Sequence, residues 1–419
     1  MRKDIIAMSQ KERQRYHLLK MVIGCKVTLK EASSMMGVSY RQARRLKKKL
    51  TTFGAKGLVH GNRGRASPRA LDSELATRII ELSRTTYSEF NDIHFTEKLT
   101  EIEGITVSRD TVRRLRRTNR IKPKRKRRPK RHFKRRDRKP QEGMMVLWDG
   151  SPHRWFGKNT APCCLMAAID DATSGLCDAF FIPYECSYGY LKLLQHMVTT
   201  DGIPLAIYQD RHGSLHRNDD HWTLEEQLNG EQDPTQVGAA LKALGITPIF
   251  ALTPQAKGRI ERLFGVLQDR LIAEMELRGI TDMDAGNRFL TEYFIADYNR
   301  RFVREPETPQ RAWRSVPKGL DTDRAISFHY QAVVGNDNAV RLGGMVIDIP
   351  QGPGQRGYAK AKVEVNQLLD GSWRVYYKDS LIAHTDSTPL REPIRAKPRR
   401  KSRARAASEE QWIYMASAV

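Results

Sequence analysis

The sequence is poor in cysteine. It has five cysteines among 419 residues, and no two of them are separated by two other residues. Without such a pair a structural zinc site is not expected, and an odd number of thiols does not complete a disulfide framework. We therefore expect a reducing cytoplasm, in which these thiols are small residues of the core. They are Cys25, Cys163, Cys164, Cys177 and Cys186.

Long apolar runs are also missing. None approaches the length of about 18 residues that a membrane-spanning helix needs. Residues 1–15 contain no apolar centre of the length that signal peptides have. The basic segments lack the interleaved Trp, Phe and Leu side chains that would insert into a membrane surface. We therefore expect no membrane partner.

Acidic residues are few compared with basic ones. The chain has 48 Asp and Glu against 73 Lys and Arg, so its formal net charge is +25. A field of this sign favours polyanions, and nucleic acid is the first partner that it predicts. A chain of this length forms two to four domains, and its 39% of hydrophobic residues can build their cores.

Residues 1–58 predict a helix-turn-helix. Apolar side chains recur at helical spacing from Leu29 until Gly37 ends the helix. Ser39 begins a second, basic helix, where its hydroxyl and the Gln42 amide fit a capping box. This pattern is typical of DNA-binding units, although a helical hairpin with a solvated basic face is the alternative. The side chains expected to reach DNA are Arg41, Arg44, Arg45 and Lys48.

A basic linker, residues 59–70, leads to a second unit of the same kind at residues 71–120. Arg63 and Arg65 of the linker could enter a minor groove, and a merely flexible linker fits equally well. The second unit has its turn at Gly104 and its helix cap at Ser108. Its outward-facing arginines are expected to be Arg109, Arg113, Arg114, Arg116 and Arg117, and we assign DNA contacts to all of these but Arg116.

Two further basic segments lack the pattern of a folded element. Residues 121–139 hold 13 Lys and Arg against one Asp, and two prolines interrupt them. Such a run is extended and becomes ordered on a polyanion, so 121–140 is interpreted as a nucleic-acid-binding linker. A nuclear import signal is the competing interpretation. Residues 392–419 are expected to form a basic tail.

The composition changes at residue 144, where short apolar runs begin. MMVLWDG, CCLMAAID and LCDAFFIP predict three consecutive strands that form an antiparallel meander. A helix, the strand LAIYQD, a second helix, the strand ITPIFAL and a long helix from Gly258 follow. The polar stretch 211–233 is expected to be irregular. This order, βββαβαβα, is that of the ribonuclease H-like fold, so 141–278 is predicted to be such a domain in a multidomain α/β protein.

Three carboxylates follow or begin these elements. Asp149 and Asp210 close buried strands, and Glu261 lies early in the long helix. A single Asp after a strand is more often a turn residue. Three acids from separate elements can instead converge on a pair of Mg²⁺ ions, which prefer oxygen ligands, and such centres catalyse phosphodiester chemistry.

The motifs around these acids carry a family resemblance. The WDG, QDRHG and TPQAKGRIERLFG segments resemble the three acidic motifs of the DDE transposase and retroviral integrase superfamily, and DGSPHRWF and IDDATSG are most similar to ISNCY-type bacterial insertion-sequence transposases. The resemblance implies that Asp149, Asp210 and Glu261 are catalytic and bind two Mg²⁺ ions, with Mn²⁺ as a substitute. The separation of Asp210 from Glu261 exceeds that of retroviral integrases because of the 211–233 insertion.

Other polar residues near the acids have less defined roles. Asp170 is interpreted as lying beside the metal ligands or forming a turn, and His153 and His212 flank the first two acids. Lys257 and Arg259 are expected to contact phosphates near the scissile bond. Asp269 and Glu274 lie further along the long helix, and we expect both to be solvated.

The remainder of the chain predicts a helical connector and a small β domain. Residues 279–320 are mainly helical, and residues 321–391 alternate in short strands that resemble an SH3-like barrel. Asp370 and Gly371 mark a hairpin turn within it.

The resemblance implies a DNA transposase, a polynucleotidyl transferase and endonuclease that carries out DNA integration and recombination. It would bind double-stranded DNA at its element's terminal repeats, cut there, and join the ends to target DNA. It would act as a homo-oligomer on DNA in the bacterial cytoplasm, associated with the nucleoid. A DNA-binding regulator with an inert core and a nuclease of the same fold without strand transfer are the alternatives.

Overall fold

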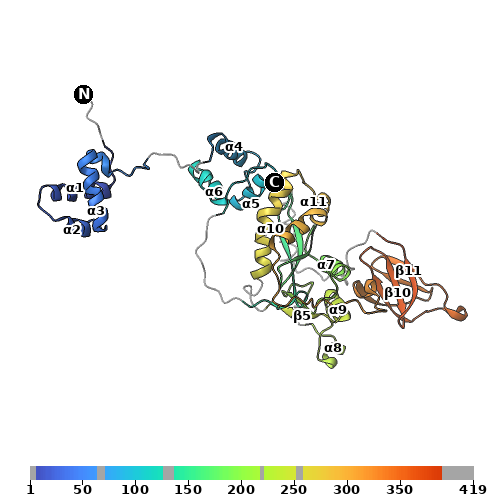
Figure 1. Cartoon of the computed structure of the whole chain (residues 1–419). Coiled ribbons are helices and arrows are strands. Elements are labelled where there is room, and N and C mark those ends of the chain that lie inside the picture. The colour runs from blue at the N-terminus through green and yellow to red at the C-terminus, as the bar shows by residue number, and fades with distance from the viewer. Residues whose placement is uncertain (1–5, 64–70, 126–135, 218–220, 252–257, 389–419) are drawn as a thin grey trace, which may run out of the picture. The chain divides into compact units, whose positions relative to one another are not determined.

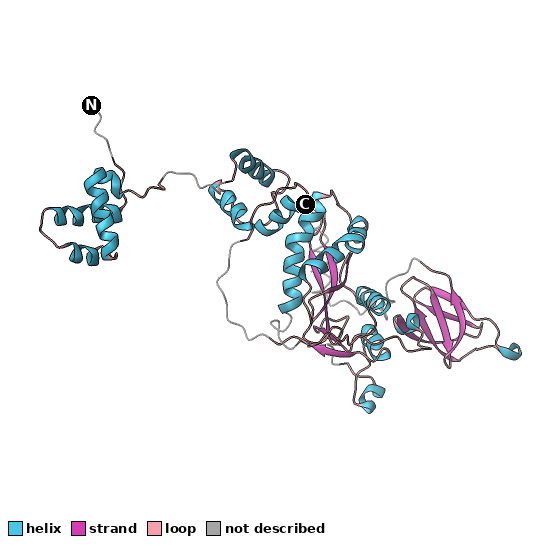
Figure 2. Cartoon of the chain, viewed as in Figure 1, coloured by secondary structure: helices cyan, strands magenta, loops and turns pink. Residues whose placement is uncertain are grey.

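The computed structural model describes residues 6–63, 71–125, 136–217, 221–251 and 258–388. The chain divides into two compact units, Met1–Arg78 and Ile79–Val419. Figures 1 and 2 show the elements of each unit. Arg65, Lys257, the basic segment 126–135 and the tail beyond residue 388 lie outside the described residues.

The first unit is built from helices around a small leucine core. Its elements are α1 (Gln10–Ile23), α2 (Leu29–Met35), α3 (Tyr40–Phe53) and the 3-10 helix η1 (Gly54–Leu58). Leu19, Leu46 and Leu50 pack together at its centre. Gly37 follows α2 with a φ of 64°, a conformation that suits glycine. The Ser39 hydroxyl accepts the Gln42 N–H, but the reciprocal bond of the predicted capping box is not formed.

The second helical region repeats this arrangement. It comprises α4 (Ser73–Arg84), which spans the boundary of the two units, α5 (Asp92–Glu101) and α6 (Arg109–Thr118). Gly104 has a φ of 66° between α5 and α6, and the Ser108 hydroxyl accepts the Thr111 N–H at the start of α6. The turn and cap predicted from the sequence are therefore confirmed at these residues.

A five-stranded sheet forms the centre of the second unit. Its order is β3-β2-β1-β4-β5, with antiparallel pairing from β3 to β1 and parallel pairing from β1 to β5. The predicted meander and the two later strands are thus confirmed. The strands are β1 (Val146–His153), β2 (Cys163–Asp170), β3 (Leu176–Ile182), β4 (Ala206–Gln209) and β5 (Thr247–Phe250).

Helices cover both faces of this sheet. Trp148 of β1 faces the core under α7 (Ser187–Thr200) and α9 (Gln236–Ala243), whereas Leu147 faces the core under α10 (Gly258–Leu277). This division follows from the alternation of side chains along a strand. α11 (Met283–Phe289), the π-helical turn η3 (Leu290–Phe294) and α12 (Ile295–Phe302) continue the second layer.

At both edges of the sheet, some backbone groups are bonded to side chains or are missing a hydrogen-bond donor. At the β3 edge, the Asn299 side chain accepts the Leu176 N–H at 2.8 Å and donates to the Leu176 carbonyl at 2.9 Å. Asn287 exchanges the same pair of bonds with Phe181. At the β5 edge, the Thr247 N–H donates to the Leu205 carbonyl just before β4, and the Ala251 N–H donates to the Gln209 carbonyl of β4. Because the backbone groups of a strand alternate in direction, the backbone nitrogen of Pro248 faces away from β4.

The polar insertion contains a short helix, which corrects the expectation of an irregular stretch. α8 (Leu224–Asn229) begins with a capping box, in which the Thr223 hydroxyl accepts the Glu226 N–H and the Glu226 carboxylate accepts the Thr223 N–H. Arg217 also pairs with Glu226. A capping box gives this polar segment local helical order without an apolar face.

The second helical region docks on the sheet domain through charged side chains. Glu274 of α10 is 3% exposed, and its Oε1 lies 2.7 Å from both His94 Nε2 and Lys98 Nζ of α5. Asp269 binds Asn91 and Lys124. The expectation that Asp269 and Glu274 are solvated is therefore wrong, because α5 covers this side of α10.

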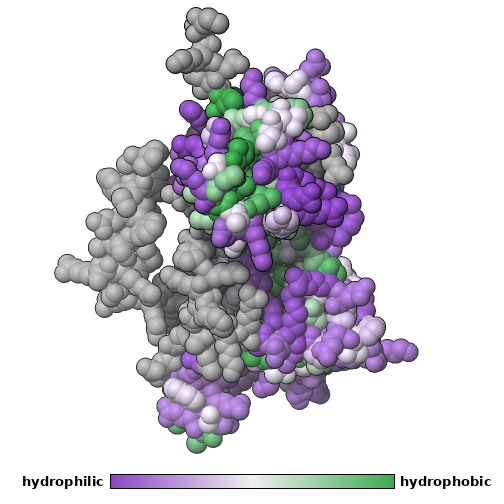
Figure 3. Space-filling view, turned by 60° about the vertical axis from the view of Figure 1, so that its left-hand side comes forward, coloured by the Kyte–Doolittle hydropathy of each residue, from purple (hydrophilic) through white to green (hydrophobic). Residues whose placement is uncertain are grey.

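The C-terminal strands form a four-stranded antiparallel sheet and a two-stranded ribbon around one core. Gly371 has a φ of 89° at the predicted turn. Hydrophilic side chains predominate among the coloured residues in the view of Figure 3, in keeping with the 29% of charged residues. The elements are α13 (Thr322–Ala325), β6 (Phe328–Val333), β7 (Ala339–Leu342), β8 (Met345–Asp348), η4 (Pro353–Gln355), β9 (Lys362–Gln367), β10 (Trp373–Tyr377) and β11 (Ser380–Thr385).

Candidate active site

Asp149 lies in β1, and Asp210 directly follows β4, the parallel strand beside it. Leu147 of β1 pairs with Tyr208 of β4, and continuing this register by two residues brings Asp149 opposite Asp210. Between these pairs, the Trp148 indole N–H donates to the Gln209 amide oxygen at 2.9 Å. The parallel register therefore brings two of the predicted acids together at the end of β4.

The carboxylate of Asp210 is held by the backbone that follows it. Its Oδ1 accepts the His212 N–H at 2.8 Å. The His212 ring lies with Nδ1 3.5 Å from Glu185 Oε1, and the same Glu185 oxygen accepts the Tyr190 hydroxyl at 2.5 Å. Asp210, His212, Glu185 and Tyr190 thus form one connected chain from the end of β4 to α7.

Glu185 is a residue of this site that the sequence motifs did not indicate. A Cβ built on Gly150, next to Asp149, would lie 2.7 Å from Glu185 Oε2, so glycine makes room for this carboxylate. The available signal was an acid shortly after the third strand, combined with a glycine after the first acid. By itself this signal is weak, because an acid that follows a strand is usually a turn residue.

The buried groups beside these acids remain protonated at neutral pH. Burial, followed by the negative charge of Glu185, raises the pKa of the Tyr190 hydroxyl far above its usual value. Burial and Glu185 also raise the pKa of the Cys164 thiol to about 12. Cys163 and Cys164 are buried as expected, but Cys25 is exposed, which corrects the expectation that all five thiols are core residues.

Glu261 lies in the first turn of α10, and its side chain is exposed. Within the described ranges, no three His, Cys, Asp or Glu side chains gather closely enough to hold a metal ion. The structure thus brings Asp149 and Asp210 together by strand register, and it does not join Glu261 to them as a ligand set. Residues 252–257, which connect β5 to α10, lie outside the described residues.

Arg259 is bound within the protein. It pairs with Asp171, which is fully buried, and donates to the Arg136 carbonyl at 2.6 Å. Arg136 also pairs with Asp171, at 2.5 Å. The two guanidinium groups neutralise the buried carboxylate, so the expectation that Arg259 is available for phosphates is not met in this arrangement.

Asp170 forms a turn. Its carboxylate accepts N–H groups from Gly143 and Thr173, and burial nevertheless raises its pKa. It pairs with Val146, three residues before Asp149 on β1. His153 lies at the exposed end of β1, with its ring edge-on to Trp155 at 5.5 Å.

The arginines assigned to DNA differ in their environments. Arg116 is 2% exposed and donates to Asp92 at 2.8 Å, so the expectation that it faces outward is wrong. Arg117 donates to the same carboxylate at 2.6 Å, and Arg63 pairs with Glu12 at 2.5 Å. The side chains exposed as predicted are Arg41, Arg44, Arg45, Lys48, Arg109, Arg113 and Arg114.

Two curated relatives match most of the chain, whereas no protein-family model matches it. A protein of Sinorhizobium fredii (strain NBRC 101917 / NGR234) named as transposase y4bF is 34% identical over 394 residues, which cover 91% of this chain and 84% of that protein. The transposase for insertion sequence IS1202 of Streptococcus pneumoniae is 29% identical over 435 residues, which cover 93% of this chain and 91% of that protein.

Among solved structures, similar chains occur in retroviral assemblies. One is in a simian T-cell lymphotropic virus intasome bound to the PP2A regulatory subunit B56 gamma; it has 13% identity and a TM-score of 0.30, over 73% of this chain and 95% of that one. The HTLV-2 integrase catalytic core domain in complex with magnesium has 14% identity and a TM-score of 0.27, over 40% of this chain and 94% of that one. These likenesses are distant.

Proposed function

The chain belongs to the transposases, and we propose that, as a DDE-type enzyme, it binds the terminal repeats of its element, cuts the DNA there and joins the ends to target DNA. The observation that supports this proposal is the β1–β4 register, whose pairs Val146–Ile207 and Leu147–Tyr208 lead toward Asp149 and Asp210. Two carboxylates at one level on neighbouring strands supply hard oxygen ligands from a rigid support.

Asp149 and Asp210, together with Glu261, would hold Mg²⁺. Two ions are proposed, with Mn²⁺ as a substitute. When bound, Mg²⁺ supplies charge neutralisation at phosphorus and a water of lowered pKa. The chain's own residues hold the ligands in place: the His212 N–H fixes the Asp210 carboxylate, and Trp148 fixes the strand before it.

The helical regions would supply DNA recognition. We assign helix-turn-helix roles to 1–58 and 71–120, in which α3 and α6 present exposed arginines to a major groove. The linkers 59–70 and 121–140 would track the phosphate backbone, residues 279–320 would connect the core to a barrel of SH3-like type at 321–391, and 392–419 would be a basic tail. DNA ends are joined in pairs, so the active form would be a homo-oligomer on DNA in the bacterial cytoplasm.

The proposal is tested with labelled end DNA, a target plasmid and Mg²⁺. Wild-type protein should bind the ends, cut them and give joined products. The variants Asp149→Asn, Asp210→Asn and Glu261→Gln should bind the ends without cutting. Glu276→Gln is the matched control, because Glu276 is also an exposed acid of α10.

Each alternative function has its own outcome. Binding of ends without any cutting by wild type would indicate a regulator with an inert core, and cutting without joining would indicate a nuclease. Joining of ends by Asp210→Asn protein would show that the assignment of the acids is wrong.

A further inference from the structure

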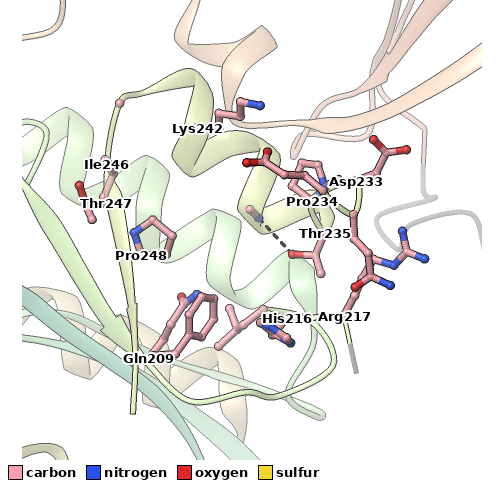
Figure 4. Close-up of a pocket in the computed structure, with 16 residues that line it drawn as sticks. Gln209, His216, Arg217, Asp233, Pro234, Thr235, Lys242, Ile246, Thr247 and Pro248 are labelled. Carbon is pink, nitrogen blue, oxygen red and sulfur yellow. Dashed lines mark hydrogen bonds between the residues drawn. The ribbon is translucent and has the colours of Figure 1, made fainter. Parts of the chain in front are cut away.

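A cavity of about 600 Å³ lies beside β4, the strand that directly precedes Asp210. Residues of β4, β5 and α9 and of the segments around 215–217 and 231–235 line it (Figure 4). Pockets that take small ligands span roughly 300–1,000 Å³. Its size therefore suits one compact organic group.

The cavity contains a hydrogen-bond donor with no partner. Gln209 lines it, is fully buried, and uses its amide oxygen to accept the Trp148 indole N–H. This bond fixes the orientation of the amide, since the opposite orientation would set the NH₂ group against the indole N–H. Among the described residues, the Gln209 Nε2 then has no hydrogen-bond partner. A buried donor of this kind calls for an acceptor on a ligand.

The walls of the cavity suit a flat, uncharged ring. The rings of His216 and Phe250 meet edge to face with centroids 4.9 Å apart, and Leu215 and Pro248 add apolar surface. Aromatic walls favour planar groups through stacking and edge contacts.

The charges in the lining balance. Arg217 and Lys242 are matched by Glu231 and Asp233, and Arg217 also pairs with Glu226. A phosphate group would need an excess of positive charge, which this lining does not offer. The cavity thus favours a neutral ring with a hydrogen-bond acceptor.

We propose that this cavity binds a nucleobase, whose acceptor edge takes the Gln209 amide N–H and whose ring contacts Phe250 and His216. The expected source is a base turned out of bound DNA, because the end of β4 adjoins this cavity through Gln209 and leads directly to Asp210. This source rests on the proposed transposase function. A free nucleotide is the other source of the same chemistry.

Photocrosslinking tests the proposal directly. The full-length Asp210→Asn protein is mixed with end DNA that carries 5-iodouracil at successive positions near the cleavage site, irradiated, and digested for mass spectrometry. One position should crosslink to Phe250 or His216. Phe250→Leu should lower the yield of that crosslink by about fivefold or more, as expected from loss of aromatic contact with a base. Trp222→Leu is the matched control, since Trp222 is an exposed aromatic residue outside the cavity.

Separate measurements distinguish a failure of folding, of DNA binding and of base binding in the cavity. Circular dichroism of each variant confirms folding, and gel mobility shift measures DNA binding. Absence of DNA binding by wild type would contradict the proposed function itself. Crosslinks only outside the cavity, with DNA bound and wild type active, would overturn the present proposal. Crosslinking by 5-iodo-dUMP but not by DNA would assign the cavity to a free nucleotide.

Discussion

Trp148 and Gln209 tie two parallel strands together one residue before the paired aspartates. Their indole-to-amide hydrogen bond is 2.9 Å long, and both side chains are fully buried. Trp148→Phe removes the donor and leaves the Gln209 amide oxygen without a partner. We expect the free energy of unfolding to fall by about 1–3 kcal/mol more than it does when a tryptophan without such a bond is replaced by phenylalanine.

Trp373 provides the control for this measurement. It is also fully buried, and its indole nitrogen has no hydrogen-bond partner in the part of the chain that the structure describes. Trp373→Phe therefore makes the same change in size without breaking a hydrogen bond. Urea unfolding of both variants gives the comparison, and equal losses would contradict a stabilising role for the Trp148 bond.

Glu185 should matter for Mg²⁺-dependent cleavage, because it holds the His212 segment that fixes the Asp210 carboxylate. Groups that orient metal ligands typically contribute 10–100-fold to metal affinity or activity. We expect Glu185→Ala to lower cleavage by about that factor and to raise the Mg²⁺ concentration needed, with end binding unchanged. Glu185→Gln keeps an acceptor for Tyr190 and should recover part of the loss. A similar loss in Glu276→Ala would argue against a specific role.

Glu274 should be essential for the stability of the docked helical region. It is buried between His94, Lys98 and Arg278, so Glu274→Ala leaves the Lys98 ammonium buried without this partner. Breaking a buried pair from one side costs about 3–5 kcal/mol. Chemical unfolding should show this loss. Glu276→Ala, on the exposed side of the same helix, should change the free energy of unfolding by less than about 0.5 kcal/mol.

Stability should fall as the pH is lowered from neutral. Burial acts to raise the pKa of Glu274, but hydrogen bonds from His94 and Lys98 outweigh it and hold the pKa at about 2. A depressed carboxyl pKa gives stability above the unfolded value of 4.5 that is lost as the pH falls toward 2.

The buried His94 also makes the folded protein less stable as the pH falls, and it does so at higher pH than Glu274. Burial lowers its pKa below 6.5, so in acid the unfolded chain takes up a proton that the folded chain does not. Melting temperatures at pH 7.5 and 5.5 should therefore differ less in His94→Gln than in wild type. His384→Gln, at an exposed histidine, should leave the wild-type difference unchanged; an equal effect of both variants would refute the assignment.

Substitution of Arg113 should weaken DNA binding, whereas substitution of Arg116 should weaken folding. Arg113 is exposed on α6, and Arg113→Ala should weaken end binding and reduce the slope of log affinity against log salt by about one. Arg116 is buried against Asp92 and the Phe90 carbonyl, so Arg116→Ala should cost about 1.5–3 kcal/mol of stability. Binding titrations across salt and urea unfolding distinguish the two. The reverse pattern would contradict the assignment of α6 as the DNA-reading helix.

Local signals predicted much of this fold. Gly37 and Gly104 ended helices where the chain needs a positive φ, and Ser39 and Ser108 capped the helices that follow. The apolar runs around Asp149 and Asp210 gave β1 and β4. These features depend on residues within a few positions of one another, which is why a sequence pattern can reveal them.

Long-range contacts set the limits of that prediction. Helical periodicity identified the polar side of α10, but it could not show that α5 covers Glu274 with Lys98 and with His94, which lies 180 positions earlier. The same limit applies to Arg116, which looked like one more exposed arginine. The place of Glu185 in the site likewise depends on long-range contacts, since its partners Gly150 and His212 come from separate elements.

The two edges of the central sheet have a consequence for aggregation. Asn287 and Asn299 occupy backbone groups of β3, and Pro248 presents no N–H at the free side of β5. An unprotected edge is a template on which another chain can add a strand. Both edges of the sheet therefore offer fewer free backbone groups to a strand of another molecule, which disfavours aggregation through shared β-structure.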